Sequence, residues 1–386
     1  MRAVLLSLPS PGDSPQPKIA GKSLAQRQLL FAKEAGCEMA VLHGGGAGEQ
    51  AIALRHMAER LGMRFQTVSN AHALPGIIGS GDSMLVVQPG LLPEAREALD
   101  LIAAEGDRAL VVSSGPGTSA GLERIDLDRA WGGVLTMPGS WLGRLAALPE
   151  DVAPHAALLR IALQHRLPEA RLDDAILDAG RWTVLTSAES AGAREQGWLR
   201  EHVGDAKAFA PSRWLARLVL LKGAHALLER AWTLPLALTS FAILLLGGVA
   251  SAWLEKPVLG FALIALGVPV LECALGLRRL AIAPFGAIRR LPWLRHAIDA
   301  GLLFAGVAAI DGLWFRAAFP PFALVAGLIV LDRMYADHLL DAVGDRGLVA
   351  AAIAILSAIA MPELALVLVA SAILLAVLIP RAPKRG

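Results

Sequence analysis

Apolar and polar residues follow different patterns in the two parts of this chain. Up to about residue 205, short β-prone apolar runs recur (AVLLS, MAVLHG, MLVVQP and ALVVSS), and segments with helical spacing such as SLAQRQLLFAKEAG separate several of them. The opening segment MRAVLLSLPSPGD predicts the first strand. Alternating strands and helices predict a parallel sheet covered on both faces, with a ligand site in the loops at the carboxyl ends of the strands.

The pattern changes after Pro211. The segment SRWLARLVLLKGAHALLERA has helical spacing, with an apolar face beside two arginines. Such a helix is expected to lie in the membrane interface, and an ordinary surface helix packed on the first part of the chain is the alternative. The residues that carry this prediction are Trp214, Leu215, Leu218, Leu221, Arg213 and Arg217.

Six apolar segments follow and predict six membrane spans. The loop RRLAIAPFGAIRRLPWLRH after the second segment is rich in arginine, whereas the connections near Glu255 and Pro362 are short and nearly uncharged. The positive-inside rule places the arginine-rich loop in the cytoplasm, and an even number of spans places the N-terminal part and the tail on that same side. The six segments are Trp232–Trp253, Val258–Leu277, Ala297–Trp314, Phe319–Leu331, Leu348–Met361 and Glu363–Ile379.

These patterns divide the chain into four regions: an α/β domain (1–205), a juxtamembrane helix (206–231), a six-helix transmembrane domain (232–380) and a basic tail (381–386). We expect an integral protein of a bacterial inner membrane, with the N-terminal domain and the C-terminus in the cytoplasm. Membrane lipids are then its first partners. Small-residue pairs such as Gly247–Gly248 would also permit close helix packing and a homodimer.

Composition agrees with this division and excludes some classes of protein. The 386 residues are 55% apolar, and the mean hydropathy is +0.53. A net charge of +2 argues against a nucleic-acid partner. Cys37 and Cys273 lie far apart and form neither a disulfide framework nor a zinc pattern, so both are expected to be reduced packing residues.

The segment PKIAGKSL, followed by an amphipathic helix, resembles the start of the sugar and polyol nucleotidyltransferases. The resemblance covers most of residues 1–205, so it implies a nucleotidyltransferase-like, Rossmann-like α/β fold for this domain. It also implies that Lys18 and Lys22 bind a nucleotide or a sugar or polyol phosphate, because a lysine can follow phosphate as charge builds up. Backbone N–H groups of the glycine turn at Gly44 and Gly45 are a further candidate for binding an anion.

The sequence departs from this family where the family binds Mg²⁺. The resemblance places one metal-binding aspartate after the strand SMLVV, where Pro89 or Gly90 stands, and a second after the Trp182 strand, where Leu185 or Thr186 stands. Prolines also replace much of the glycine-rich phosphate loop. Without carboxylate oxygens Mg²⁺ is poorly held, so we expect a domain that does not catalyse nucleotidyl transfer.

The membrane part supports the same relationship. A nucleotidyltransferase-like head, an amphipathic helix and six spans together resemble the fused inositol-phosphate cytidylyltransferase and CDP-alcohol phosphotransferase enzymes. The resemblance matches Arg278 and Gly286 to a motif arginine and glycine, and it implies that Arg278, Arg279, Gly286 and Arg290 bind a lipid head group or a CDP-alcohol. The acidic positions of that motif carry Val270, Cys273, Arg290 and Leu294.

Other acidic residues could replace the missing metal ligands. Asp337 and Asp341 are one helical turn apart and would share a cation such as Mg²⁺, or they belong to a solvated acidic loop that also holds Asp332 and Asp345. Glu272 and Asp299 are further substitutes, although an intramembrane pair of Glu272 with Arg278 or Arg279 is the preferred interpretation.

A different class is suggested by LHGGGAG and GTSAG, which resemble the oxyanion loop and nucleophile elbow of esterases, with Ser119 as the nucleophile. Besides this esterase interpretation, three hypotheses about function remain. The chain is a divergent transferase-like protein of phospholipid or sphingolipid head-group metabolism with lost or altered metal chemistry, an active transferase with a relocated acidic site, or a membrane scaffold without catalysis.

Overall fold

The computed structural model describes residues 1–9, 16–44, 48–104, 106–149, 152–204, 210–230, 232–285, 292–334 and 342–378. The chain forms two compact units. The first, here called the head, comprises Met1–Trp198 together with Ile282–Ala287. The second, here called the helical unit, comprises Leu199–Ala281 and Ile288–Gly386.

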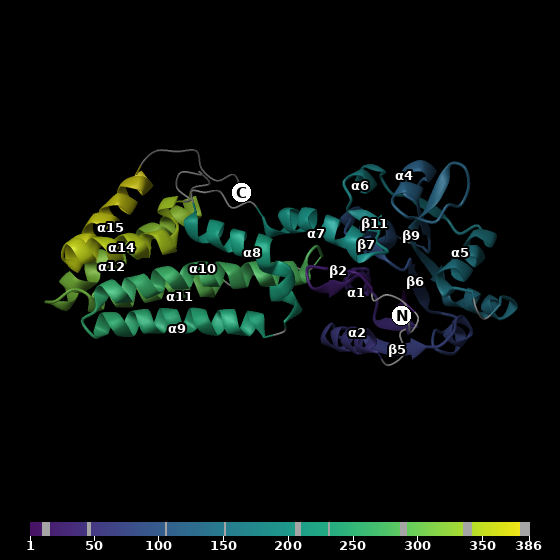
Figure 1. Cartoon of the computed structure of the whole chain (residues 1–386), viewed down its shortest axis with the longest axis horizontal. Helices are drawn as coiled ribbons and strands as arrows, with labels where there is room; N and C mark the ends of the chain where they lie inside the picture. Colours follow the sequence, from purple (N-terminus) through teal and green to yellow (C-terminus); the bar gives the residue numbers. More distant parts are fainter. Residues whose placement is uncertain are drawn as a thin grey trace. The chain divides into compact units, whose positions relative to one another are not determined.

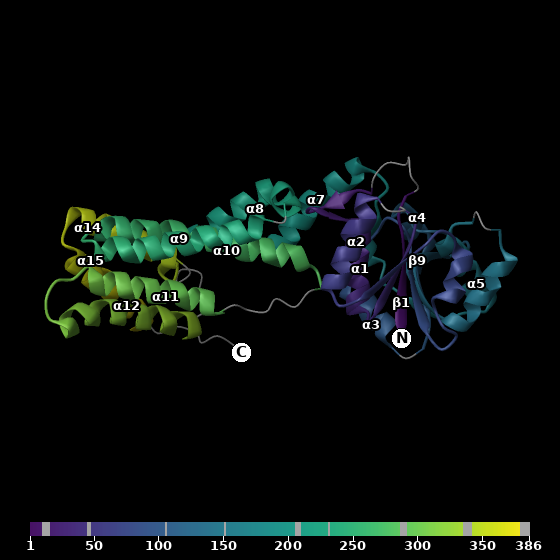
Figure 2. The same cartoon turned by 90° about the horizontal axis from the view of Figure 1, so that it is seen from below.

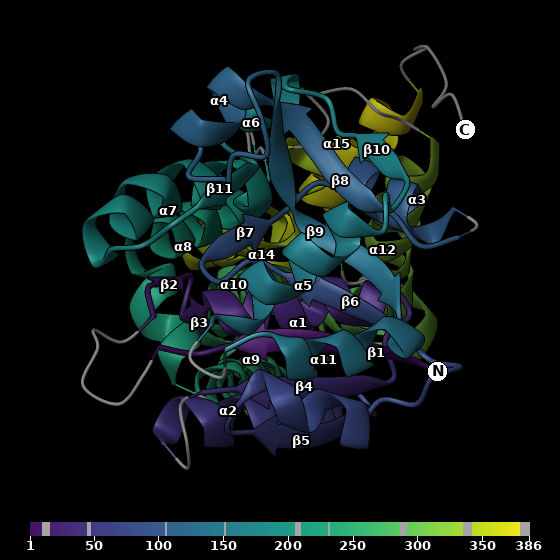
Figure 3. The same ribbon diagram turned by 90° about the vertical axis from the view of Figure 1, so that its right-hand side faces the viewer.

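The head is built on a seven-stranded sheet with the order β10-β8-β9-β6-β1-β4-β5, which Figure 3 shows from top to bottom. Strand β1 pairs in parallel with β4 and β6, and β4 pairs in parallel with β5, as the sequence predicted. In these pairs Leu5 lies opposite Val41 and Val4 opposite Leu85. The strands are β1 (Arg2–Ser7), β4 (Met39–His43), β5 (Arg64–Val68), β6 (Ser83–Val87), β8 (Ala109–Ser113), β9 (Arg129–Pro138) and β10 (Glu169–Arg171).

The sheet is mixed rather than fully parallel, which corrects the sequence prediction. Strand β9 runs antiparallel to both β6 and β8. The connection from β8 to β9 holds the short helix α4 (Ser114–Ser119) and turns back through an antiparallel bridge between Arg124 and Ala130. The connection therefore returns the chain without the long crossover helix that β9 would need in order to run parallel to β8.

Helices cover both faces of the sheet, because residues of one strand point alternately to opposite sides. Val4 and Leu6 of β1 pack toward one core and Ala3 and Leu5 toward the other. Figure 2 shows α1 (Leu24–Glu34), α2 (Glu49–Arg60) and α3 (Arg96–Ala103) on one face and α5 (Pro154–Gln164) on the other. The remaining elements are β2 (Lys18–Ile19), β3 (Lys22–Ser23), η1 (Ala71–Gly76), β7 (Leu91–Pro93), η2 (Gly139–Ala147), α6 (Ala175–Asp178), β11 (Trp182–Val184) and α7 (Ala188–Val203).

A segment distant in sequence completes the first core. Phe285 is only 2% exposed and meets Phe31 of α1 edge to face, with ring centroids 5.6 Å apart. The Arg96 guanidinium donates to the Phe285 carbonyl at 3.3 Å. Trp182 also packs on Phe31, with ring centroids 5.8 Å apart, and donates its indole N–H to the Gly132 carbonyl at 2.8 Å.

The helical unit is a bundle in which α9 packs on α11, α11 on α12, and α15 on both α12 and α14 (Figure 1). Gly248 of α9 and Gly260 of α10 let these two helices approach closely, since a Cβ atom on either glycine would lie 2.7 Å from the carbonyl oxygen of the other. The helices are α8 (Pro211–Glu229), α9 (Thr233–Trp253), α10 (Pro257–Ile282), α11 (Pro292–Ala308), α12 (Trp314–Met334), α14 (Arg346–Ile359) and α15 (Pro362–Leu378).

Among the described residues, three helices are long and apolar enough to cross a membrane: Thr233–Trp253, Pro257–Ile282 and Trp314–Asp332. The predicted count of six spans is not confirmed. Helices α14 and α15 are apolar, but their 14 and 17 residues correspond to about 21 and 26 Å, less than the roughly 30 Å of a bilayer core. The composition and length of the three long helices indicate a membrane protein.

Helix α8 buries one side on which most residues are small, and it exposes bulkier apolar side chains on another. Ser212, Ala216, Leu220 and Ala224 are buried at four-residue spacing. Trp214 and Leu215, on the face that the sequence assigned to the membrane interface, are 40% and 47% exposed. An exposed aromatic and aliphatic face is what an interfacial helix presents to lipid.

Candidate functional site

The head contains a cavity of about 350 Å³ at the carboxyl ends of its parallel strands, where the sequence predicted a ligand site. Ser7 ends β1 and His43 ends β4, so these two strands place both side chains at the same edge of the sheet. This head cavity is lined by Ser7, Leu8, Pro9, Gln16, Pro17, His43, Pro89, Gly90, Ala153, Pro154, His155, Leu185 and Thr186.

The residues at the positions where the resemblance expects metal-binding aspartates come together in this cavity. Pro89 and Gly90 follow β6, Leu185 and Thr186 follow β11, and all four line the wall. None of them offers a carboxylate oxygen. Within the described residues, no three His, Cys, Asp or Glu side chains gather closely enough to hold a metal ion. The cavity therefore does not fit the Mg²⁺ that the resemblance implies.

Two histidines, which the sequence analysis did not select, give the head cavity its polar character. Burial lowers the pKa of His43, and burial together with the neighbouring His43 lowers the pKa of His155. Both imidazoles are therefore mostly neutral at pH 7. His43 is the histidine of the HGGG segment, but the sequence analysis selected the glycines of that segment rather than the histidine.

None of the described residues that were predicted to bind phosphate lines the head cavity. Lys18 and Lys22 stand on the β2–β3 hairpin and are not among the residues that line the cavity. Burial, followed by the charges of Arg27 and Arg60, lowers the pKa of Lys22 from 10.5 to about 8. Gly44 has φ +79°, and a Cβ atom there would lie 2.6 Å from the Leu8 carbonyl oxygen. A glycine is thus required for this close approach; Gly45 lies outside the described residues.

Ser119 does not stand on a nucleophile elbow. It is the last residue of α4, and its hydroxyl donates to the Gly115 carbonyl at 3.0 Å. An elbow needs the serine between a strand and a following helix, whereas here the helix precedes it. The local structure therefore argues against the esterase interpretation.

The helical unit contains a second cavity, of about 190 Å³, between α8, α10 and α11. Four arginines and one glutamate supply its charged groups, and we call it the arginine pocket. Its wall depends on Gly276, where a Cβ atom would lie 2.3 Å from the Leu220 side chain of α8. The lining residues are Val203, Gly204, Arg213, Ala216, Arg217, Leu220, Glu272, Leu275, Gly276, Arg279 and Arg295.

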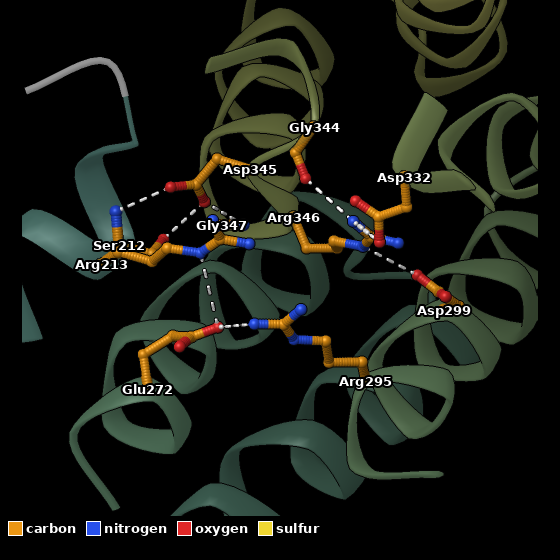
Figure 4. A network of polar contacts seen from close by, with 10 residues as sticks. All are labelled: Ser212, Arg213, Glu272, Arg295, Asp299, Asp332, Gly344, Asp345, Arg346 and Gly347. Atoms are coloured by element: carbon orange, nitrogen blue, oxygen red, sulfur yellow. Dashed lines mark hydrogen bonds and ion pairs between the residues drawn. The ribbon is translucent and has the colours of Figure 1, made fainter. Parts of the chain in front are cut away.

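Glu272 is held by arginines other than those expected (Figure 4). Its carboxylate lies 3.4 Å from the Arg295 guanidinium and 4.0 Å from that of Arg213. The sequence predicted Arg278 or Arg279 as the partner. Arg279 does line the pocket, as its predicted role in head-group binding requires, whereas Arg278 does not. Gly286 and Arg290, predicted for the same role, lie outside the described residues.

A second set of ion pairs lies beside the arginine pocket. It includes Asp299, which the sequence suggested as a metal ligand. The buried Arg346 guanidinium lies 3.1 Å from Asp299 and 2.9 Å from Asp332. Asp345 accepts from the backbone N–H of Ser212 at 2.8 Å and from its hydroxyl at 2.6 Å. The predicted metal ligands Asp337 and Asp341 lie outside the described residues.

Comparisons with known proteins add no family assignment. No protein-family model matches the chain, and no curated protein matches its sequence.

Proposed function

We propose that this chain is a membrane protein of phospholipid or sphingolipid head-group metabolism that binds a phosphate-bearing head group with arginine side chains rather than through a divalent metal. The arginine pocket carries this proposal. Among the described residues that line it, Arg213, Arg217, Arg279 and Arg295 are accompanied by one carboxylate, that of Glu272.

The charge and shape of these side chains suit phosphate. With all five ionised, the charged side chains described around the pocket sum to +3. A guanidinium presents paired N–H donors that match two phosphate oxygens, and it stays protonated at every physiological pH. Because α8 also exposes Trp214 and Leu215, the pocket belongs to a helix suited to the membrane surface, where lipid phosphates are concentrated.

The same arrangement opposes metal binding. Glu272, which lines the pocket, and Asp299, on the same helix as Arg295, each pair with at least one arginine. A dication approaching either carboxylate would meet the positive charge of these guanidinium groups. In this proposal the chain is a divergent relative of the fused cytidylyltransferase and CDP-alcohol phosphotransferase enzymes, with the metal chemistry of both parts lost or altered.

The arginine-rich loop also supports an orientation. We place the head, this loop and the C-terminal tail in the cytoplasm of a bacterial cell, because cytoplasmic loops carry the excess of arginine and lysine. In this orientation the pocket faces the compartment in which soluble phosphorylated precursors are made.

Binding of phosphatidic acid tests the proposal. Full-length protein in nanodiscs containing phosphatidic acid would be examined by native mass spectrometry, with Mg²⁺ and with EDTA. We expect binding to persist in EDTA, and Arg279→Gln to weaken it about tenfold, as expected for the loss of one charge-assisted hydrogen bond. Arg278→Gln, which removes the neighbouring charge outside the pocket, is the matched control and should have little effect.

A further variant tests whether Glu272 competes with phosphate for the arginine side chains. Glu272→Gln removes the carboxylate that occupies Arg213 and Arg295 and should strengthen binding. Binding that requires Mg²⁺, or that is equally weakened by Arg278→Gln and Arg279→Gln, would contradict the proposal.

A further inference from the structure

Two sides of the helical unit offer the membrane different lengths of helix. Figure 1 shows α9 on one side of the bundle and α14 and α15 on the other. Along α9, Trp232 and Trp253 are both exposed and lie 21 positions apart with no charged residue between them, which corresponds to about 32 Å of helix. Exposed tryptophans are typical of the two boundaries of a membrane. The span of α9 therefore matches the roughly 30 Å of a bilayer core.

Helix α14 is much shorter, and both of its ends are fixed. The Asp345 carboxylate caps its first turn, and its helical hydrogen bonds end at Ala360. Its 14 residues correspond to about 21 Å. The outward face is apolar, with Leu348, Ile355 and Ile359 exposed. Helix α14 thus presents to lipid a surface about 10 Å shorter than that of α9.

Ion pairs beside α14 mark the two polar boundaries on this side. At one end Arg316 of α12, which is 67% exposed, lies 3.1 Å from Glu363 of α15. At the other end Asp332 of α12, which is 40% exposed, lies 2.9 Å from Arg346 of α14. Arg316 and Asp332 are 16 positions apart, at most about 24 Å along α12. Because charges are costly in hydrocarbon, both pairs belong at or outside its boundaries.

Neither tilt nor a shallow position of α14 removes this mismatch. Tilting α14 would shorten its reach across the bilayer further. The turn between α14 and α15 is also unsuited to the hydrocarbon, since the backbone groups of a turn would lack partners there and the Arg316–Glu363 pair lies at the start of α15. The bilayer must therefore adapt to the protein, which has a modest cost for each ångström of mismatch.

We propose that the helical unit acts as a membrane wedge: a bilayer of ordinary thickness surrounds α9, and the same bilayer is thinned to about 21–24 Å beside α12 and α14. The partner of this short surface is phospholipid whose acyl chains are compressed. Head groups on that side come down to the level of Asp332 and Arg346. The wedge concerns the lipid-facing helices rather than the arginine pocket, and so it goes beyond the proposed function.

Cysteine labelling of the full-length protein in nanodiscs of dioleoyl phosphatidylcholine tests the wedge. Leu348→Cys and Ile359→Cys place thiols near the two ends of the exposed face of α14, and Ile243→Cys places one at the middle of α9. We expect a charged, water-soluble maleimide to modify both α14 variants about tenfold faster than Ile243→Cys, because a thiol in hydrocarbon neither ionises nor meets the reagent. The wild type, with Cys37 and Cys273, gives the background.

In a bilayer of full thickness only one end of α14 can reach water, since the helix is about 10 Å too short. Slow reaction at either α14 position would therefore overturn the proposal, whether full-thickness lipid or a second copy of the chain covers that end. Circular dichroism should show unchanged helix content in each variant, so that fast labelling does not reflect unfolding.

Lipid chain length provides a second measurement. Both α14 variants should react at the same rates in phosphatidylcholine with 14-carbon chains as in the 18-carbon lipid, because the protein sets the local thickness. If one end of α14 reacts fast only in the 14-carbon lipid, the bilayer does not adapt and the wedge is refuted. Arg279→Gln should leave all these rates unchanged, and no phosphatidic acid is present, so this proposal and the proposed function can fail separately.

Discussion

Lys22 and Arg27 are cations in the interior of the head, and only one of them is well compensated. Arg27 donates to the Ile19 carbonyl from both Nε and Nη2, at 3.2 and 2.6 Å, and lies 4.1 Å above the Trp198 ring. Lys22 is pushed toward its neutral form by burial and by the neighbouring Arg27 and Arg60. We therefore expect Lys22 to destabilise the head wherever it is protonated.

Lys22→Met should stabilise the head at pH 7, and the gain should shrink between about pH 8 and pH 10.5. In that window the unfolded chain still binds the Lys22 proton and the folded chain has released it, so the stability of the wild type rises with pH. Hydrogen exchange of head peptides at pH 7 and pH 9.5 measures the difference. Lys18→Met, at the exposed position of the same hairpin, should show little change; a gain that is independent of pH would contradict this explanation.

At the scale of single elements, Asp345 joins two helices. Its carboxylate caps α14 by accepting from Gly347 N–H at 2.9 Å and Leu348 N–H at 3.2 Å. It also accepts from the backbone and hydroxyl of Ser212, at the start of α8. This carboxylate thus ties the start of α8, next to Arg213 of the arginine pocket, to the start of α14.

Asp345→Ala should reduce the stability of the helical unit by about 2 kcal/mol, since it removes a helix cap and two further hydrogen bonds. Urea titration in mild detergent, followed by far-ultraviolet circular dichroism, measures the loss. Asp345→Asn retains an acceptor and should lose less, and Asp311→Ala, at an exposed position, is the control. If the Asp345 and Asp311 variants unfold alike, the cap contributes nothing.

The sequence predicted individual elements better than their assembly. Strands such as Met39–His43 and helices such as Leu24–Glu34 lie where their periodicity places them, because that periodicity reflects burial within one element. The sites depend on contacts between elements. Arg213 and Arg295 belong to different helices, and His43 and His155 are separated by more than a hundred residues. No spacing rule relates such positions, because they meet only through the packing of the sheet and the bundle.

At the scale of the whole molecule, the head is discontinuous in sequence. The predicted domain of residues 1–205 is one continuous segment, whereas the first compact unit also takes in Ile282–Ala287. Phe285 has no sequence signature that distinguishes it from the apolar residues of the preceding helix. Its burial and its contacts with Phe31 and Arg96 show that it belongs to the core of the head.

Phe285→Ala should destabilise the head by about 3 kcal/mol, the usual cost of removing a buried phenyl ring. Limited proteolysis of the full-length protein, with the head fragments identified by mass spectrometry, reports the effect. Leu127→Ala removes a side chain that is 82% exposed and should leave cleavage unchanged. Equal cleavage of the two variants would show that Phe285 is dispensable.

The packing of Phe285 on Phe31 imposes an order on biosynthesis. A ribosome translating this chain completes β11 and α7 long before it reaches residue 285, and it must first produce both α9 and α10. Until then the nascent head has an open apolar site at Phe31 and Trp182. The first two apolar helices would therefore be delivered to the insertion machinery before the head closes its core, so that membrane insertion precedes the final step of folding.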